Sequence, residues 1–557
     1  MMQSSEEPIR LPYTQSAIPL ARLWLALACV LLYSKFLGNP WSFDDMYMFG
    51  DDKMLRAYSE KLFFDFNLRW FSYVTFGWTY NFFGTDLFWH RVVNLALHAT
   101  VVLGLYAFLK QLFTHVLQGE AAGNENAARA AFWGALLFAV HPLSVYGEGY
   151  LIERSIVMAT LFSILAMHAF LMGLSGKGHK WYFLAAAWYF VAVFSKEHAV
   201  MLPLALLALI PLVRNDYRTL VRELLIPFIV YFSISLLVVL KAKGILGTPY
   251  EQHAMEMLST IAKAKGETGT VTNAFGLSIL LQGYLFFKYL MLWMVPNVNW
   301  MSIDLQQQFP GAMMQWPETI GLLAYIGYPV LVGRLIFKGG KKGLLGYALI
   351  FPWIMFFTEF STVRMVETFV LYRSYLWMIS MPVALPILLG KMDSKRENGV
   401  LVAIVLVLAV LAWNRLNTFT NDLRLWEDVV AKLPKEKTSG MYRAYLNRGV
   451  ANATRGQNSE ALEDLNRAVE LNPKSTSSLV SRGALKNNMG RFNDAYADLT
   501  QASEIDPRYA GAYANRALSQ FNLGNRSMGF DDIYRALEIE PDNKNYRKIL
   551  KWAIENQ

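Results

Sequence analysis

Long apolar runs dominate the first 415 residues of the 557-residue chain. A bilayer core requires roughly 20 apolar residues per helix. Runs of about this length lie at 17–37, 91–110, 130–147, 154–173, 181–195, 198–213, 223–241, 318–336, 343–360, 369–390 and 398–415. The first run follows a polar tail and lacks the small-residue pattern of a cleavage site, so we expect a signal anchor. The pattern predicts an all-α chain whose residues 1–415 form a polytopic helical membrane domain.

The orientation of these spans follows from the positions of Lys and Arg, which favour the cytoplasmic side in short loops. Four short basic loops, near 177–180, 214–222, 338–342 and 391–396, are therefore placed inside. The loop 38–90 and everything after residue 415 then lie outside, with about eleven full crossings. This orientation requires that a further apolar piece, 273–296, does not cross the membrane once but is re-entrant or interfacial. One crossing more or fewer would move the tail to the cytoplasm.

The tail is richer in charged residues and contains an internal repeat. Pro473, Pro507 and Pro541 are 34 residues apart. Columns of small residues keep the same spacing, beginning at Gly449, Gly456, Ala461 and Ala468. Thirty-four residues is the tetratricopeptide period, and small residues let the two helices of each hairpin approach closely. We expect a linker helix at 416–440, repeats at 441–474, 475–508 and 509–542, and a capping helix at 543–557.

A repeat array of this kind binds an extended peptide or protein in its concave groove. The alternative is a rigid spacer or a dimerisation surface.

Composition excludes several classes of function. Charged residues make up only 17% of the chain, against about 25% in soluble proteins. The single cysteine, Cys29, lies in the first apolar run, which argues against a disulfide scaffold, a cysteine-ligated zinc site and thiol chemistry. The net charge of +9 lies mostly in the membrane part, where it reflects topology, so no nucleic-acid partner is expected. No nucleotide-binding glycine motif precedes a helix.

Two adjacent carboxylates, Asp44 and Asp45, follow the first span. One of them could accept a proton from an attacking hydroxyl group while the other orients it or raises its pKa. The alternative is a helix N-cap in a solvated loop.

Further polar side chains lie at the outer ends of later spans, where ionisable groups are functional candidates. They are His90, Asn94, His98, His141, Glu148, Glu153, Arg154, Lys196 and Glu197, joined later in the chain by Lys288 and Arg373. The first three share one helical face at spacings of four residues. Arg and Lys suit a phosphate group, although any single member could be a snorkelling anchor or a helix-packing hydrogen bond. No recurring histidine spacing supports a metal, so no cofactor is expected.

The order of these motifs resembles one family. Five motifs occur in the same order as in that family. They are the acidic pair after the first span, then Phe83-Gly84 through His90, Asn94 and His98, then His141-Pro142 through Glu148 to Arg154, then Ser195-Lys196-Glu197, and last a lone Arg373 in a tyrosine-rich stretch. The chain resembles the transmembrane and tetratricopeptide-repeat O-mannosyltransferases and their bacterial relatives, in the GT-C glycosyltransferase superfamily. The likeness covers almost the whole chain. It departs at Glu153, where the family often has Gly, and at Tyr372, where the family has Glu before the arginine.

The resemblance implies an inverting transferase that moves sugar from a polyprenyl-phosphate carrier to a hydroxyl group on the non-cytoplasmic face. Asp44 or Asp45 would be the general base. Arg154, Lys196 and Arg373, with Lys288, would meet the leaving phosphate. The remaining candidates, His90, Asn94, His98, His141, Glu148, Glu153 and Glu197, would line the cavity, and residues 242–296 would cover it.

The repeats favour a protein acceptor on an exported chain, with the protein in a bacterial inner membrane and the repeats in the periplasm. The alternatives are a glycan or lipid acceptor and a membrane-anchored scaffold without catalysis. A transporter would show duplicated halves, and none is found.

Overall fold

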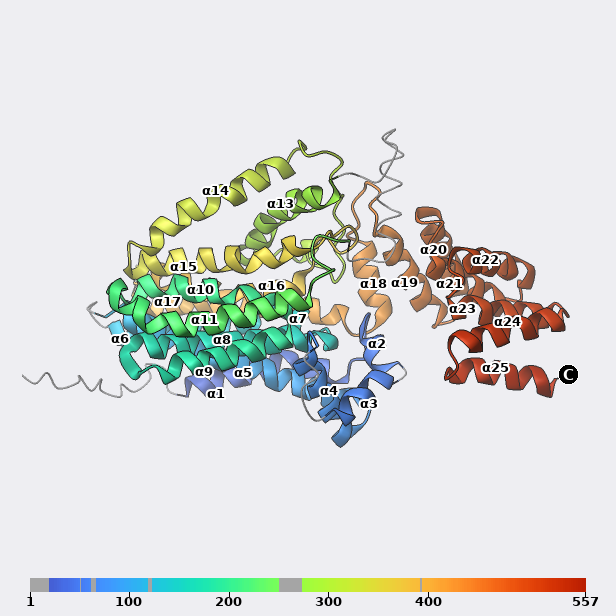
Figure 1. Ribbon diagram of the computed structural model, residues 1–557, viewed down its shortest axis with the longest axis horizontal. Coiled ribbons are helices and arrows are strands. Elements are labelled where there is room, and N and C mark those ends of the chain that lie inside the picture. The colour runs from blue at the N-terminus through green and yellow to red at the C-terminus, as the bar shows by residue number, and fades with distance from the viewer. Residues whose placement is uncertain are drawn as a thin grey trace, which may run out of the picture.

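The computed structural model describes residues 20–50, 52–61, 67–118, 123–249, 273–390 and 393–556. Within these ranges the chain is helical, with two isolated β-bridges and no strand. A bundle of long helices forms one part of the molecule, and stacked helical pairs form the other (Figure 1). The expectation of an all-α chain is confirmed.

Long helices form the bundle because their apolar stretches bury faces against one another and expose the remainder to lipid. Eight helical stretches of the described chain are long and apolar enough to cross a membrane. The bundle contains α1 (Ala21–Tyr33), α4 (Trp70–Phe83), α5 (Leu87–Val116), α6 (Gly123–Val140), α8 (Arg154–Met172), α9 (Lys180–Ser195), α10 (Leu202–Val213), α11 (Tyr217–Lys241), α13 (Ala274–Met294), α14 (Glu318–Ile336), α15 (Gly340–Met355) and α17 (Ser394–Thr418).

One expected span, 369–390, is not a continuous helix. It consists of a 3₁₀ turn at Leu371–Arg373, the short helix α16 (Ser374–Met378) and a 3₁₀ stretch at Met381–Ile387 that packs against α6 and α15. Pro382 and Pro386 lie in the last stretch, and proline removes a backbone donor and clashes with the preceding helical turn. The expectation of a regular helix here is wrong for that reason.

Several connecting segments gather at one end of the bundle, which we call the loop end (residues 38–69, 84–86, 141–153 and 356–373). The short helices α2 (Asp45–Phe49), α3 (Lys53–Glu60) and α7 (Ser144–Glu148) belong to it. Figure 1 shows α2 beside α18 (Asp422–Val430), the first helix after the bundle. The loop 38–90 and the tail therefore lie at the same end. Residues 250–272, part of the predicted cover 242–296, lie outside the described residues.

Helix α13 corresponds to the apolar piece 273–296, for which a re-entrant or interfacial path is predicted. Its 21 residues are long and apolar enough to cross a membrane. The chain enters it at the loop end, where the Ser278 hydroxyl donates to the Thr362 carbonyl at 3.3 Å. Shortly after the helix, the Met301 carbonyl accepts from Arg415 Nη1 at 2.8 Å, near the end of α17. Both neighbours lie at the loop end, so the chain returns to the end from which it entered.

The tail forms the repeated helical hairpins. They are α19 (Met441–Ala453) with α20 (Asn458–Leu471), α21 (Thr476–Asn488) with α22 (Phe492–Ile505), α23 (Ala510–Asn522) with α24 (Arg526–Ile539), and the last helix α25 (Lys544–Glu555). One ion pair recurs with the 34-residue period, as Arg448–Asp464, Arg482–Asp498 and Arg516–Asp532 at 2.6–2.7 Å. Each pair joins the two helices of one hairpin.

A small residue is required where the helices of a hairpin cross. A Cβ atom on Gly483 would lie 2.7 Å from Leu499 Cγ, which is closer than packed carbons approach.

Candidate active site

A cavity of about 550 Å³ lies at the loop end of the bundle. One wall is apolar and includes Val238, Val239, Ile245 and Leu246, at and after the end of α11. The other walls are rich in charged and polar side chains, namely Asp44, Arg69, Glu153, Ser155, Lys196, Glu197, His198, Arg364, Glu367 and Arg373. Five candidates from four separate parts of the chain thus meet at one cavity, namely Asp44, Glu153, Lys196, Glu197 and Arg373.

Asp44 lies immediately before α2 and is the only member of the acidic pair that lines this cavity. Its backbone N–H donates to the Tyr150 hydroxyl at 3.0 Å. Burial raises the pKa of Asp44 to about 6, although a hydrogen bond with Tyr150 opposes the change. The carboxyl group is therefore mostly ionised at neutral pH and can accept a proton.

Asp45 has a different role. Its two carboxylate oxygens accept backbone N–H groups, from Ser42 at 3.0 Å and from Ile152 at 2.8 Å. The side chain is fully buried, and burial raises its pKa to about 7, with Arg91 opposing. Asp45 ties the loop after α1 to the segment before α8, so the structure leaves Asp44 as the candidate base.

Lys196 projects from the break between α9 and α10. Its ammonium group donates to Glu153 Oε2 and, at 3.3 Å, to the Ser155 hydroxyl. The aromatic ring of Tyr372 lies 5.0 Å away. Burial lowers the pKa of Lys196, while Glu153 opposes this change. The contacts fix the ammonium group at the cavity wall.

Arg69 and Glu197 form a second pair on the same wall. Arg69 donates to Glu197 through Nε at 3.0 Å and through Nη2 at 2.6 Å. Such a bidentate pair fixes both side chains.

Two arginines meet at Glu359. Arg373 Nη1 donates to Glu359 Oε2 at 2.9 Å, and Arg364 Nε lies 3.4 Å from the same oxygen. Arg373 Nη2 also lies 3.7 Å from Glu367. Carboxylates therefore hold the cations in place and balance their charge, and an entering anion would share these donors.

Arg154, expected to contact phosphate, does not line this cavity. Its Nε donates to Asn94 Oδ1 at 2.6 Å, and its Nη2 donates to the His90 carbonyl at 2.9 Å. The guanidinium carbon lies 3.7 Å from the centre of the Phe76 ring. The side chain is fully buried and joins α8 to α4 and α5. The structure thus places Arg154 among internal helix contacts, and its contact with a phosphate group stays a prediction.

The predicted histidine lining is also wrong for this cavity. His90 Nε2 lies 3.1 Å from the Gly84 carbonyl, and His98 Nδ1 lies 2.7 Å from the Tyr375 hydroxyl. His141 Nδ1 accepts the backbone N–H of Leu143 at 3.2 Å. The shared helical face of His90, Asn94 and His98 packs against other helices, where each imidazole contacts an internal partner through one ring nitrogen.

Two further candidates lie elsewhere. Glu148 is fully buried in α7, and burial raises its pKa to about 8 although Arg91 and Arg154 oppose the shift. Lys288 on α13 donates to Gln307 Oε1 at 2.6 Å. Neither residue is among the described residues that line the charged cavity.

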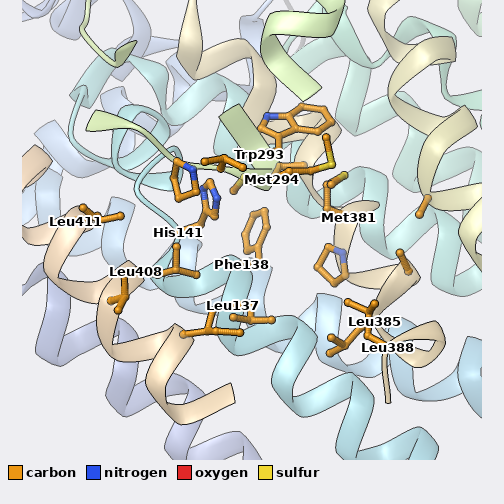
Figure 2. Close-up of a pocket in the computed structure, with 18 of the residues that line it drawn as sticks. Leu137, Phe138, His141, Trp293, Met294, Met381, Leu385, Leu388, Leu408 and Leu411 are labelled. Atoms are coloured by element: carbon orange, nitrogen blue, oxygen red, sulfur yellow. The ribbon is translucent and has the colours of Figure 1, made fainter. Parts of the chain in front are cut away.

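A second cavity, of about 960 Å³, lies between α6, α15, α17 and the broken stretch 378–388. Figure 2 shows Trp293 and His141 toward one end and Leu385 and Leu388 toward the other. The described residues that line it include no carboxylate and no Lys or Arg. Its lining suits hydrocarbon rather than proton transfer.

Sequence reasoning missed Arg69, Arg364 and Glu359. Each is one charged residue in an irregular or terminal segment, and nothing in its local pattern separates it from an ordinary surface charge. Among the described residues, no three His, Cys, Asp or Glu side chains are grouped to hold a metal, and the absence of a metal stays a prediction.

Comparison with known proteins gives one family match, a tetratricopeptide repeat at residues 442–475. The tail is a tetratricopeptide-repeat array. The YrrB structure, a tetratricopeptide-repeat protein with an unusual peptide-binding site, is 20% identical with a TM-score of 0.22, and the match covers 30% of this chain and 88% of YrrB. No curated protein sequence matches this chain.

Two solved structures match most of the chain. The Archaeoglobus fulgidus oligosaccharyltransferase tethered with an acceptor peptide is 14% identical, with a TM-score of 0.40 and 80% of this chain covered. The oligosaccharyltransferase AglB of the same organism, in complex with an inhibitory peptide and a dolichol-phosphate, is 12% identical, with a TM-score of 0.39 and 79% covered. The chain spans 59% of the length of each.

Proposed function

We propose that this protein is a membrane glycosyltransferase that moves one sugar from a polyprenyl-phosphate donor to a hydroxyl group of an exported protein. The observation that carries the proposal is the composition of the charged cavity. Among the described residues that line this cavity, Asp44 is the one aspartate, and it shares the cavity with Lys196 and Arg373.

The proposed reaction is a direct displacement. The acceptor hydroxyl oxygen bonds to the anomeric carbon of the sugar as the bond from that carbon to the phosphate oxygen breaks, which inverts the carbon. Asp44 takes the hydroxyl proton. The polyprenyl phosphate leaves with additional negative charge, which the fixed cations of Lys196 and Arg373 stabilise.

The apolar wall supports a lipid-linked donor. Val238 and Val239 lie in the last turn of α11, a helix with many lipid-exposed side chains such as Leu236 and Leu240. A polyprenyl chain would thus approach the cavity from the bilayer side. The tail docks at the loop end, where an aqueous acceptor would arrive, and we place this end on the periplasmic face of a bacterial inner membrane.

A transfer assay tests the proposal. Purified protein receives a panel of radiolabelled polyprenyl-phosphate sugars with membrane and periplasmic extracts, beside the variants Asp44→Asn, Lys196→Met and Lys288→Met. Label is expected in a protein band with wild type and with Lys288→Met, and it is expected to be lost with Asp44→Asn and strongly reduced with Lys196→Met.

Other outcomes change the proposal in defined ways. Label that moves to lipid or glycan rejects the protein acceptor but keeps the chemistry. No transfer from any donor, together with full complementation of a deletion strain by Asp44→Asn, overturns the enzyme and leaves a membrane-anchored scaffold.

A further inference from the structure

The residue before the candidate base has an unusual backbone conformation. Phe43 has a φ of +56°, in the left-handed region that bulky residues rarely adopt. Such a conformation is strained and persists only where surrounding contacts hold it. The contacts of Phe43 therefore determine where the adjacent Asp44 side chain lies.

Two aromatic residues pack against the Phe43 ring. The Tyr150 ring centre lies 5.7 Å away, and the Trp426 ring centre lies 5.3 Å away in an edge-to-face arrangement. Tyr150 belongs to the membrane domain, whereas Trp426 lies on α18 of the tail. The tail thus provides one side of the Phe43 pocket.

Arg443, on the first helix of the first repeat, provides another side. Its guanidinium carbon lies 5.4 Å from the centre of the Phe43 ring, within the range of a cation–π interaction. Nη1 and Nη2 each lie 3.4 Å from Glu367 Oε1. Since Glu367 lines the charged cavity and lies beside Arg373, one side chain of the repeat domain contacts both the loop of the base and the ion pairs of the cavity.

The tail is fixed to the bundle on a further side. Asp428 on α18 accepts from Arg415 Nη1 at 2.9 Å and from the Ser302 hydroxyl at 3.0 Å. Lys432 donates to the Met301 carbonyl at 2.7 Å. These bonds join α18 both to the end of α17 and to the segment that follows α13. The tail therefore docks through several independent contacts.

We propose that Trp426 and Arg443 form a clamp on Phe43 that positions Asp44, so that the repeat domain is a part of the catalytic centre as well as a means of recruiting the acceptor. This inference rests on the proposed function. It assigns both residues as positioning residues, because neither lines the cavity among its described residues.

The charge of Arg443 also acts on the base. The groups that face the Asp44 carboxyl are Tyr150 and Glu153 from the segment before α8, Glu367 from the segment before α16, and Arg443 from α19. Arg373 and Lys196 lie on the walls of the same cavity. Arg443 lowers the pKa of Asp44, so removal of its positive charge moves the acid limb of the transfer rate to higher pH.

The test compares Arg443→Met, Arg443→Lys and Trp426→Leu with a control, Arg482→Met, which removes a carboxylate-paired arginine from the second repeat, away from Phe43. Two reactions are measured in the full chain: transfer to the protein acceptor, and hydrolysis of the donor, in which water replaces the acceptor. Displacement of a catalytic group by about 1 Å can cost about 100-fold in rate.

We expect Arg443→Met and Trp426→Leu to lower kcat for both reactions by about 10- to 100-fold, with the KM for the protein acceptor unchanged. Of these variants, only Arg443→Met is expected to move the acid limb of the transfer rate to higher pH, and Arg443→Lys is expected to restore it. Arg482→Met retains wild-type kcat. A rise in acceptor KM with unchanged kcat, hydrolysis and pH profile overturns the clamp and leaves the tail as a recruiting module.

Hydrogen exchange separates the clamp from the proposed function. The backbone amides of residues 41–50 are expected to exchange faster in Arg443→Met and Trp426→Leu than in wild type or Arg482→Met. If wild type transfers no sugar but this difference appears, the proposed function fails and the clamp stands. Equal exchange in all four proteins rejects the clamp whatever the activity.

Discussion

Replacement of Arg154 by methionine distinguishes a structural arginine from a phosphate-binding one. Methionine keeps an unbranched apolar stem over the Phe76 ring but removes the charge and all donors. Two strong hydrogen bonds disappear, to Asn94 Oδ1 at 2.6 Å and to the His90 carbonyl at 2.9 Å. Both acceptors then stay buried between helices without these donors.

The size of the effect follows from these contacts. A hydrogen bond to a charged group contributes about 1.5–3 kcal/mol, so the loss of two gives about 3–6 kcal/mol. We therefore expect Arg154→Met to destabilise the folded state by about 3–6 kcal/mol.

The assay is thermal unfolding of the detergent-solubilised protein, followed together with the transfer rate per folded molecule. Arg154→Met should unfold at a clearly lower temperature, while the molecules that remain folded retain a kcat within a few-fold of wild type. A variant that unfolds at the wild-type temperature and has lost transfer would refute the reasoning and return Arg154 to the donor phosphate.

Three further predictions concern the base, the cation and the repeats. Because burial raises the pKa of Asp44 to about 6 and the base must be ionised, kcat/KM should be level above that pH and fall about tenfold per pH unit below it; an initial-rate profile that is flat to pH ~4.5 contradicts this assignment. Lys196→Met should lower kcat about 10²–10³-fold through loss of charge stabilisation in the transition state, and single-turnover kinetics would reject that role if chemistry is unchanged. Gly483→Ala should destabilise the tail by about 1–3 kcal/mol because its Cβ would meet Leu499 at 2.7 Å, and an unchanged melting temperature of the tail would show that the hairpin relaxes.

The elements that sequence predicted best are those with a strong period. The 34-residue spacing of Pro473, Pro507 and Pro541 repeats a local packing requirement, and each repeat folds by contacts with its neighbours. The long apolar helices follow from length and composition alone. The stretch 369–390 was different, since its apolar length predicted a span, while the structure has a 3₁₀ turn, a short helix and a 3₁₀ stretch that contains Pro382 and Pro386.

The candidate site was predictable in composition but not in detail. Asp44 and Asp45 are adjacent and chemically identical, and only the folded backbone separates them: Asp45 accepts N–H groups from Ser42 and Ile152, whereas Asp44 faces the cavity. Arg69 has no sequence signal because its partner is distant in the chain. Glu197 lies 128 residues from Arg69, and such a pairing is fixed by tertiary structure.

A buried ionisable group in a membrane protein has two physical explanations, and its partners decide between them. Arg154 donates to an amide and a carbonyl of α5, so the fold itself provides partners for the buried charge and no ligand is needed to justify its burial. Arg373 and Lys196 are instead balanced by carboxylates at the wall of a cavity. Such carboxylates keep the cations charged in the absence of substrate, and an anionic phosphate can share their donors at the same wall. Intramembrane charge therefore points to function where ion pairs border a cavity, and to packing where neutral groups enclose the charge.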